Sequence, residues 1–126
     1  MNRKSIGKIL WVDLTVNDAT AMKSFYSNVT GWEPSPLDMG GYDDFVMNLP
    51  GTDQGVAGIC HARGGNAGLP SQWLIYITVT NLDTAMKNCK ELGGSVISEP
   101  KNMGNDRYCV IKDPAGAVAA LFEKAE

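Results

Sequence analysis

Apolar and polar residues alternate in two stretches of the chain, and each stretch predicts a strand. In residues 8–16 one face carries Val12, Leu14 and Val16, and in residues 73–79 one face carries Ile75, Ile77 and Val79. Since successive side chains of a strand point to opposite sides, the opposite faces carry Trp11, Asp13 and Thr15, and then Leu74, Tyr76 and Thr78. We expect each strand to bury its aliphatic face against a helix and to leave the other face for a binding surface.

An amphipathic helix is predicted directly after each of these strands. Asp18 and Asn81 are the expected N-caps, because their side-chain oxygens can accept from free backbone N–H groups. The apolar positions recur at intervals of three and four: they are Ala19, Met22, Phe25, Tyr26 and Val29, and then Leu82, Ala85, Met86, Cys89 and Leu92. Glycines end both helices, at Gly31 and at Gly93-Gly94.

Three short strands are expected after each helix. Turn-forming residues separate short apolar runs, which places strands at about 32–36, 45–49 and 56–62, and again at about 95–99, 107–112 and 117–123. The run Asp113-Pro114-Ala115-Gly116 has the composition of a tight turn between the last two strands.

The two halves of the chain repeat one another. Thr20-Ala21-Met22-Lys23 returns as Thr84-Ala85-Met86-Lys87, each time after a strand that ends in Thr-Val. Such a repeat indicates two copies of one supersecondary unit, neither of which can bury its own apolar face. We therefore predict a single domain over residues 1–126, with module one at about 6–62, a glycine-rich linker at 63–71 and module two at about 72–124.

Composition and charge exclude several classes of protein. The 126 residues include 44% hydrophobic residues and carry a net charge of −3, which argues against a nucleic-acid partner because such partners select clustered basic surfaces. No apolar run approaches the roughly 18 residues of a membrane span. The three cysteines are widely spaced and odd in number, so no disulfide framework is predicted. We expect a cytoplasmic protein without a membrane partner.

Four motifs, in this order, carry a family resemblance. They are Val16-x-Asp18, Phe25-Tyr26, Gly31-Trp32 and Asp113-Pro114-x-Gly116. With them the chain resembles the vicinal oxygen chelate superfamily, which includes glyoxalase I, bleomycin-resistance proteins, fosfomycin-resistance proteins and extradiol dioxygenases. The resemblance implies an α+β fold in which paired βαβββ modules form a U-shaped, partly open barrel, commonly in a homodimer.

The resemblance also implies where a metal ion would sit. Metal-using members hold a divalent ion with four inward His, Glu or Gln side chains, two from each module. The aligned positions in this chain are Trp11, Gly58, Leu74 and Ala120, and none of these side chains can donate a lone pair to Mn, Fe, Ni or Zn. We therefore predict no metal and no other cofactor. His61, the single histidine, is expected on the outer, helix-side face.

A smaller group within this superfamily is closer. Its members open with Trp-x-Asp/Glu-Leu, as Trp11–Leu14 does, and they carry Trp-x-x-Tyr at the start of module two, as Trp73–Tyr76 does. An alanine follows their Asp-Pro-x-Gly turn, as Ala117 does here. This group is called glyoxalase-like and lacks the metal ligands, which agrees with the four positions above.

The faces left free by the helices are expected to line a cleft between the modules, the default place for a ligand. The predicted ligand-binding residues are Trp11, Asp13, Gly58, Cys60, Leu74, Tyr76, Ala120 and Phe122. Phe45 and Met47 are further candidates, and Arg107 is expected as a rim charge, whereas Trp32 and Trp73 are expected to be structural. Such a lining suits a small aromatic or apolar molecule.

Asp13 is the one charged residue on an otherwise apolar strand, and it has two interpretations. It can anchor a cationic or hydrogen-bond-donating ligand, or act as a general base with a raised pKa. Alternatively, it is a structural carboxylate paired with Tyr76, Arg107 or a backbone N–H. We favour a metal-independent protein that binds a small molecule. The alternative is a metal-independent or unusual lyase or isomerase of the glyoxalase type, with Asp13 as the base. A structural or regulatory role is a third possibility, and the sequence leaves open whether any reaction is catalysed.

Overall fold

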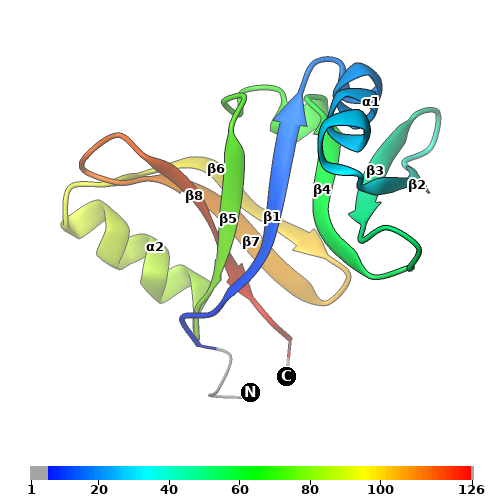
Figure 1. Cartoon of the computed structure of the whole chain (residues 1–126). Helices are drawn as coiled ribbons and strands as arrows, with labels where there is room; N and C mark the ends of the chain where they lie inside the picture. Colours follow the sequence, from blue (N-terminus) through cyan, green and yellow to red (C-terminus); the bar gives the residue numbers. More distant parts are fainter. Residues whose placement is uncertain (1–5, 126) are drawn as a thin grey trace. The chain divides into compact units, whose positions relative to one another are not determined.

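The computed structural model describes residues 6–125 and shows one βαβββ arrangement twice (Figure 1). The first copy consists of β1 (Ile9–Val16), α1 (Ala19–Thr30), β2 (Glu33–Asp38), β3 (Asp43–Asn48) and β4 (Gly55–His61). The second consists of β5 (Trp73–Thr78), α2 (Leu82–Glu91), β6 (Ser95–Met103), β7 (Asp106–Lys112) and β8 (Val118–Glu123), after a short 3-10 helix at Gly64–Asn66. The predicted α+β class and the internal repeat are confirmed. Within the described residues, neither helix has the length and apolar character needed to cross a membrane.

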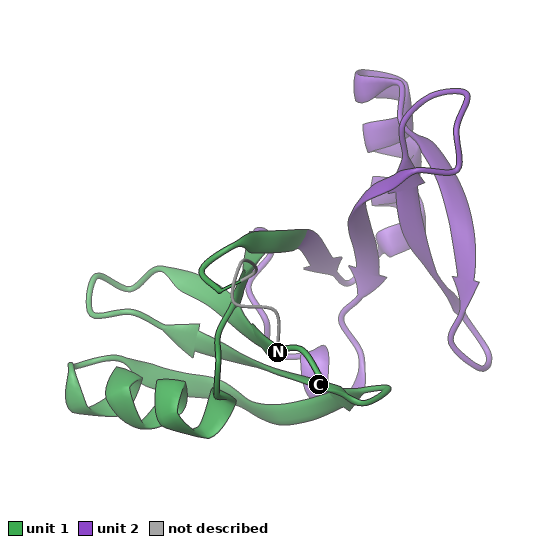
Figure 2. Cartoon of the chain, turned by 90° about the horizontal axis from the view of Figure 1, so that it is seen from below, with its two compact units in different colours: residues 1–11, 74–126 green, residues 12–73 purple. Residues whose placement is uncertain are grey.

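The chain divides into two compact units, which Figure 2 colours separately. Unit 1 takes residues 1–11 and 74–126, and unit 2 takes residues 12–73. The strand order is β2-β3-β4-β1 in unit 2 and β6-β7-β8-β5 in unit 1. In both, the opening strand is parallel to the last strand of its copy, while the other neighbours are antiparallel. The two units are therefore built on one pairing scheme.

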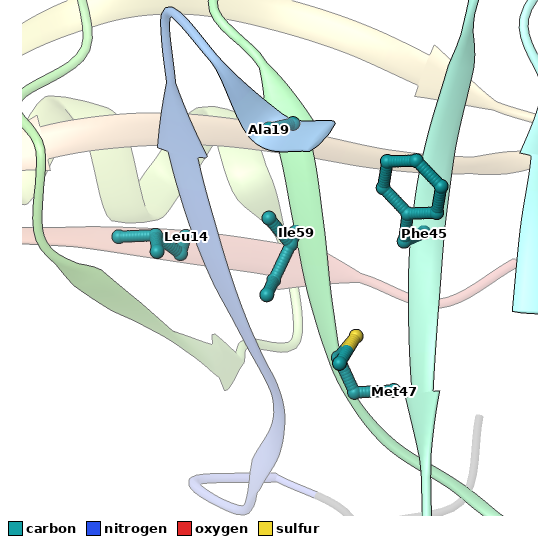
Figure 3. Packing of buried hydrophobic residues seen from close by; sticks show 5 residues of the cluster. All are labelled: Leu14, Ala19, Phe45, Met47 and Ile59. Carbon is teal, nitrogen blue, oxygen red and sulfur yellow. The ribbon is translucent and has the colours of Figure 1, made fainter. Parts of the chain in front are cut away.

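The core of unit 2 lies between α1 and one face of its sheet. Figure 3 shows five buried residues of this core: Leu14, Ala19, Phe45, Met47 and Ile59. Partly buried Val16, Met22 and Tyr26 pack against them, so the aliphatic face of β1 meets α1 as its alternation predicts. The opposite face of this sheet is free of the helix.

The core of unit 1 has the same plan. Leu82, Cys109 and Leu121 are buried together, with Ile77, Val79 and Met86 packed against them. Ile77 lies on the predicted helix-facing side of β5. The alternate residues of this strand, Leu74, Tyr76 and Thr78, therefore point to the face without a helix.

Both predicted N-caps are confirmed. The Asp18 carboxylate accepts from the Ala21 backbone N–H at 3.0 Å, and the Asn81 side chain accepts from the Thr84 N–H at 2.9 Å. Gly31 ends α1 at a φ of 84°, a left-handed conformation that favours glycine. The two N-caps explain why both helices begin at matched places in the repeat.

The predicted apolar face of each helix includes residues that are exposed in the structure. Phe25 is 52% exposed and Val29 is 65% exposed, although their spacing places them beside Met22 and Tyr26. Leu92 is 77% exposed and lies just past the end of α2. Of the predicted apolar face of α1, Ala19, Met22 and Tyr26 belong to or pack against the core of unit 2.

β6 extends four residues beyond its predicted end at 99. It continues through Pro100 to Met103, with irregular pairing to β7 between Val96 and Lys101. A proline is tolerated there because β6 lies at the edge of its sheet, where an N–H is not needed on the outer side.

Candidate functional site

The helix-free face of unit 2 carries several polar residues, together with Val46, which lies opposite Gly58. β1 contributes Asp13 and Thr15, and β4 contributes Gly58 and Cys60; Asp13 lies opposite Gly58, and Thr15 lies opposite Cys60. Thr15 is 3% exposed, whereas Asp13 and Cys60 are partly buried. Glycine at position 58 leaves no side chain between Asp13 and the next strand. The predicted residues Asp13, Gly58 and Cys60 are thus brought together on one face.

The third strand of this unit corrects one expectation and adds two residues. Phe45 and Met47 belong to the α1 core and do not line the helix-free face. Their neighbours Asp44 and Asn48 therefore point to that face, where they are 6% and 5% exposed. The Asn48 amide donates to the Glu33 carbonyl at 3.0 Å and to Ser35 Oγ at 2.7 Å. Alternation of Phe45 with Met47 was the signal that could have identified Asp44.

Cys60 lies in an acidic environment. Burial and the carboxylates of Asp13 and Asp44 raise the pKa of the Cys60 thiol, which also hydrogen-bonds with Asp44. A carboxylate oxygen of Asp44 accepts from the His61 backbone N–H at 2.9 Å, which holds it beside the thiol. Cys60 is therefore a neutral thiol at physiological pH and not an activated nucleophile.

We expect native Cys60 to react with iodoacetamide at pH 8 at least about tenfold more slowly than Cys60 of the urea-unfolded chain, because the thiolate is the reactive form. Asp44→Asn should accelerate the native reaction, since it removes one of the charges that raise the pKa. Peptide mass mapping gives the rates of alkylation; equal rates in folded and unfolded protein would contradict this interpretation.

The raised pKa of the Cys60 thiol also makes stability depend on pH. Because the unfolded chain releases this proton near its ordinary pKa of 9.0 and the folded chain retains it, the free energy of unfolding should fall as the pH rises above 9.

The helix-free face of unit 1 is aromatic. Tyr76 lies opposite Ala120, and Phe122 lies opposite both Thr78 and Tyr108. The rings of Tyr76 and Tyr108 are 5.9 Å apart between centroids, at 50°. Buried Leu74 lies on the same face. The predicted residues Leu74, Tyr76, Ala120 and Phe122 therefore share one surface, to which the structure adds Tyr108.

Lys101 lies at the far side of this aromatic face. Its ammonium is 5.9 Å from the Tyr108 ring centroid, and Lys101 lies opposite Tyr108 in the β6–β7 pairing. Partial burial lowers the pKa of the Lys101 ammonium. Neither Tyr108 nor Lys101 was predicted from the sequence, because the predicted strand ended at 99, before Lys101, and Tyr108 faces Lys101 only through the pairing of β6 with β7.

Several other candidate residues have structural environments. Trp73 Nε1 donates to the Tyr26 hydroxyl at 3.1 Å, and the Trp32 and Trp73 rings pack edge to face at 5.9 Å. Arg107 forms an ion pair with Asp83 at 3.2 Å. Trp11 is half-buried on β1, at the last residue of the first segment of unit 1.

His61 packs against Tyr42 at the end of β4. The two rings are 5.6 Å apart at 90°, and the Arg63 guanidinium lies 3.9 Å from the Tyr42 ring centroid. His61 follows Ile59 on the same side of β4, and Ile59 belongs to the α1 core. This places His61 on the helix side, as predicted.

The strand pairing supports the internal alignment behind the four metal positions. Asp13 lies opposite Gly58 in β1 and β4, and Tyr76 lies opposite Ala120 in β5 and β8. Trp11 and Leu74 each lie two residues before these opposed pairs, so the four positions correspond within the repeat. Their side chains do not fit a divalent ion, since tryptophan, glycine, leucine and alanine supply no metal ligand. In residues 6–125, no group of three or more His, Cys, Asp and Glu side chains is arranged to hold a metal.

The same pairing shows how the two faces diverge. Asp13 of β1 corresponds to Tyr76 of β5, and Cys60 of β4 corresponds to Phe122 of β8. Thr15 and Thr78 also correspond, and both are buried. One module thus presents carboxylates and a thiol where the other presents aromatic rings.

Comparison with known proteins agrees with this architecture. Curated relatives include "Putative glyoxylase CFP32" of Mycobacterium tuberculosis, 32% identical over 117 residues that make up 90% of this chain and 44% of the relative. Another is "Anthracycline biosynthesis protein DauV" of a Streptomyces species, 29% identical over 120 residues, which cover 95% of this chain and 42% of that protein. The chain therefore spans less than half the length of these relatives.

Solved structures resemble the chain over nearly its whole length. A methylmalonyl-CoA epimerase in complex with methylmalonyl-CoA and NH4+ has a TM-score of 0.56 at 16% identity, covering 96% of both chains. A glyoxalase/bleomycin resistance protein/dioxygenase superfamily member from Vibrio splendidus has a TM-score of 0.58 at 15% identity, covering 90% of this chain and 97% of that one. At such identities the likeness shows the fold alone.

The family itself is established by sequence. The family model described as Glyoxalase/Bleomycin resistance protein/Dioxygenase superfamily matches residues 8–121, which include every strand and helix of both modules except the last two residues of β8. The order of elements and the repeat are those that the resemblance implied. The chain therefore belongs to the glyoxalase/bleomycin resistance protein/dioxygenase superfamily.

Proposed function

We propose that this protein binds a small aromatic or apolar molecule on the helix-free faces of its modules, without a metal ion. The observation that carries the proposal is the residue set at the four family metal positions, Trp11, Gly58, Leu74 and Ala120, none of which can ligate an ion. The aromatic face of unit 1 supports it: Tyr108 is only partly buried, next to Tyr76 and Phe122, which are 7% and 6% exposed, and an aromatic lining suits a flat molecule. Enclosure of both faces in one cleft stays a prediction of the sequence.

The polar face of unit 2 supports a preference for ligands with a positive charge or a hydrogen-bond donor. Asp13 and Asp44 lie there beside a neutral thiol, so the face carries negative charge without a basic side chain among its residues named above. A carboxylate in partly buried surroundings attracts a cation more strongly than one in water. We propose Asp13 as the ligand's charged anchor.

An enzymatic alternative uses the same carboxylate. Asp13 lies opposite Gly58, so β4 places no side chain directly opposite it. In this alternative, Asp13 abstracts a proton from the substrate as a general base in a metal-independent lyase or isomerase reaction.

Cytoplasmic location, a homodimer and the absence of a nucleic-acid partner also stay predictions of the sequence.

Matched ligands test the anchor. We expect naphthylmethylamine to bind the wild type more tightly than naphthylmethanol, and Asp13→Asn to weaken the amine about tenfold while leaving the alcohol unchanged. Asp53→Asn, which removes the same charge from an exposed loop of unit 2, is the control. Calorimetric titration measures both affinities, and a thermal-shift screen extends the panel, since a ligand of the folded state raises the Tm.

The outcomes separate the two functions. Equal loss of both ligands in Asp13→Asn, or no loss of either, would rule out Asp13 as a charge-selective anchor. Loss of turnover of a carbonyl substrate in Asp13→Asn, with unchanged substrate affinity, would favour the enzyme.

A further inference from the structure

A bulge in β6 turns one lysine onto the aromatic face of unit 1. Ser98 lies opposite Val110, and further along the same strand Lys101 lies opposite Tyr108. Residues 98 to 101 of β6 thus span the same length as residues 110 to 108 of β7, which leaves one extra residue in β6. Such an extra residue is a β-bulge, and Pro100 is tolerated within it because a bulged residue needs no N–H for pairing.

The bulge decides which face of the sheet Lys101 occupies. Without the extra residue, Pro100 would lie opposite Tyr108, and Lys101 would point to the side of the sheet that α2 covers. Bulges commonly turn a side chain toward a functional surface. The irregular pairing of β6 therefore has a definite result, which is a positive charge beside the aromatic rings.

The Lys101 side chain lies where a ligand can reach it. Lys101 and Tyr108 are both partly exposed, and the ammonium is 5.9 Å from the centroid of the Tyr108 ring. At this distance a cation and an aromatic ring attract one another. Because the ammonium has lost part of its hydration, it attracts an anion more strongly than an ammonium in bulk water does.

We propose that Lys101 selects aromatic ligands that carry a carboxylate. This inference rests on the proposed function and names a ligand class for the aromatic face. The Lys101 ammonium donates to the carboxylate, while the ring of the ligand contacts Tyr108. A carboxylate matches the single charge of one ammonium, whereas a phosphate group carries nearly two negative charges.

The test compares naphthoate with naphthylmethanol, which share a ring system and differ in charge. By calorimetric titration at pH 7 and low ionic strength, we expect the wild type to bind naphthoate about tenfold more tightly. Lys101→Met should abolish this preference by weakening naphthoate, with the affinity for naphthylmethanol unchanged. Lys101→Arg, which keeps the charge, should retain the preference. Lys87→Met removes an exposed charge from α2 and should behave as the wild type.

A purely protective role of this lysine predicts a different result. β6 is an edge strand, and a charge on an edge strand can serve only to prevent its pairing with another chain. With that role alone, Lys101→Met would aggregate more readily and would bind naphthoate as tightly as the wild type does. This result would overturn the inference.

A second readout needs no variant. Acetylation of Lys101 and Lys87 by acetic anhydride is followed in the same sample by peptide mass mapping. Saturating naphthoate should slow the acetylation of Lys101 at least about fivefold and leave that of Lys87 unchanged, because the bound carboxylate holds the ammonium in its charged, unreactive form. Equal protection of Lys101 by saturating naphthylmethanol would contradict a specific contact with the carboxylate.

The failure of this inference differs from failure of the proposed function. Equal affinity of the wild type for naphthoate and naphthylmethanol, or binding of naphthylmethylamine alone, overturns the role of Lys101 while aromatic binding stands. A preference for naphthoate that survives in Lys101→Met has the same meaning. A wild type that binds none of the three compounds contradicts the binding of small aromatic molecules, and with it the inference.

Discussion

Replacement of Ile59 by alanine is expected to lower the free energy of unfolding by about 2–5 kcal/mol, the usual cost of truncating a fully buried aliphatic side chain. Ile59 is 0% exposed in the middle of β4, where it packs with Leu14, Phe45 and Met47 beneath α1 (Figure 3). The change leaves a cavity at the point where β1 and β3 meet the same strand, with Leu14 and Phe45 both opposite Ile59. None of these neighbours can fill it without leaving its own contacts.

Urea denaturation measures this loss as a lower midpoint at an unchanged slope. Ile9→Ala is the matched control, because Ile9 is 57% exposed on β1 and should cost under about 1 kcal/mol. Equal losses in the two variants would contradict the assignment of Ile59 to the core.

Gly94→Ala should destabilise the fold by about 1–3 kcal/mol, as for other substitutions that overfill a packed site. A Cβ at this position would lie 2.6 Å from Cys89 Sγ and 2.9 Å from the Lys112 backbone oxygen. The sulfur can rotate away, but the carbonyl belongs to β7 and cannot move without disturbing the sheet. The end of α2 would therefore be pushed away from β7.

Gly68→Ala is the control for this variant. No heavy atom lies within 4 Å of its added Cβ, and its φ is outside the left-handed region. We expect thermal unfolding of Gly68→Ala to match the wild type or to rise slightly, because alanine reduces the freedom of the unfolded chain. If Gly94→Ala were as stable as Gly68→Ala, the close approach of α2 and β7 would be refuted.

The two glycines after α2 show how far a sequence motif can be interpreted. Gly93-Gly94 predicts the end of a helix, and Gly93 has the left-handed φ of 97° expected there. Glycine is needed at position 94 for a different reason, because its backbone lies close to the Lys112 carbonyl of β7. Lys112 is 18 positions away in the sequence, so no local pattern indicates this contact. Local patterns thus predicted the caps and the helix ends but not this tertiary contact.

The candidate site was predictable to a similar extent. Strand alternation placed Asp13, Cys60, Tyr76 and Phe122 on the helix-free faces, because the helix-facing residues beside them are strongly apolar. Asp44 was missed, since Phe45 and Met47 were assigned to the free face and this hid the buried carboxylate next to them. Tyr108 and Lys101 depend on how β6 pairs with β7, and an irregular register cannot be deduced from periodicity.

The repeat explains why one fold can present two chemistries. Strand pairing fixes Asp13 and Tyr76 at corresponding positions, and likewise Thr15 and Thr78, so backbone geometry is conserved between the modules while side chains differ. The position of a site is therefore set by the fold, and its chemistry by a few residues on the free faces. This is why family membership by itself does not specify a ligand or a reaction.

We propose that ligand binding needs no metal ion, because the four positions where the family resemblance places metal ligands hold Trp11, Gly58, Leu74 and Ala120. The most direct measurement is elemental analysis of the purified protein, followed by calorimetric titration of the EDTA-treated protein with naphthylmethylamine. We predict no stoichiometric Mn, Fe, Ni or Zn and the same affinity before and after treatment with the chelator. About one ion per chain, with binding lost when it is removed and restored when it is added back, would contradict the account.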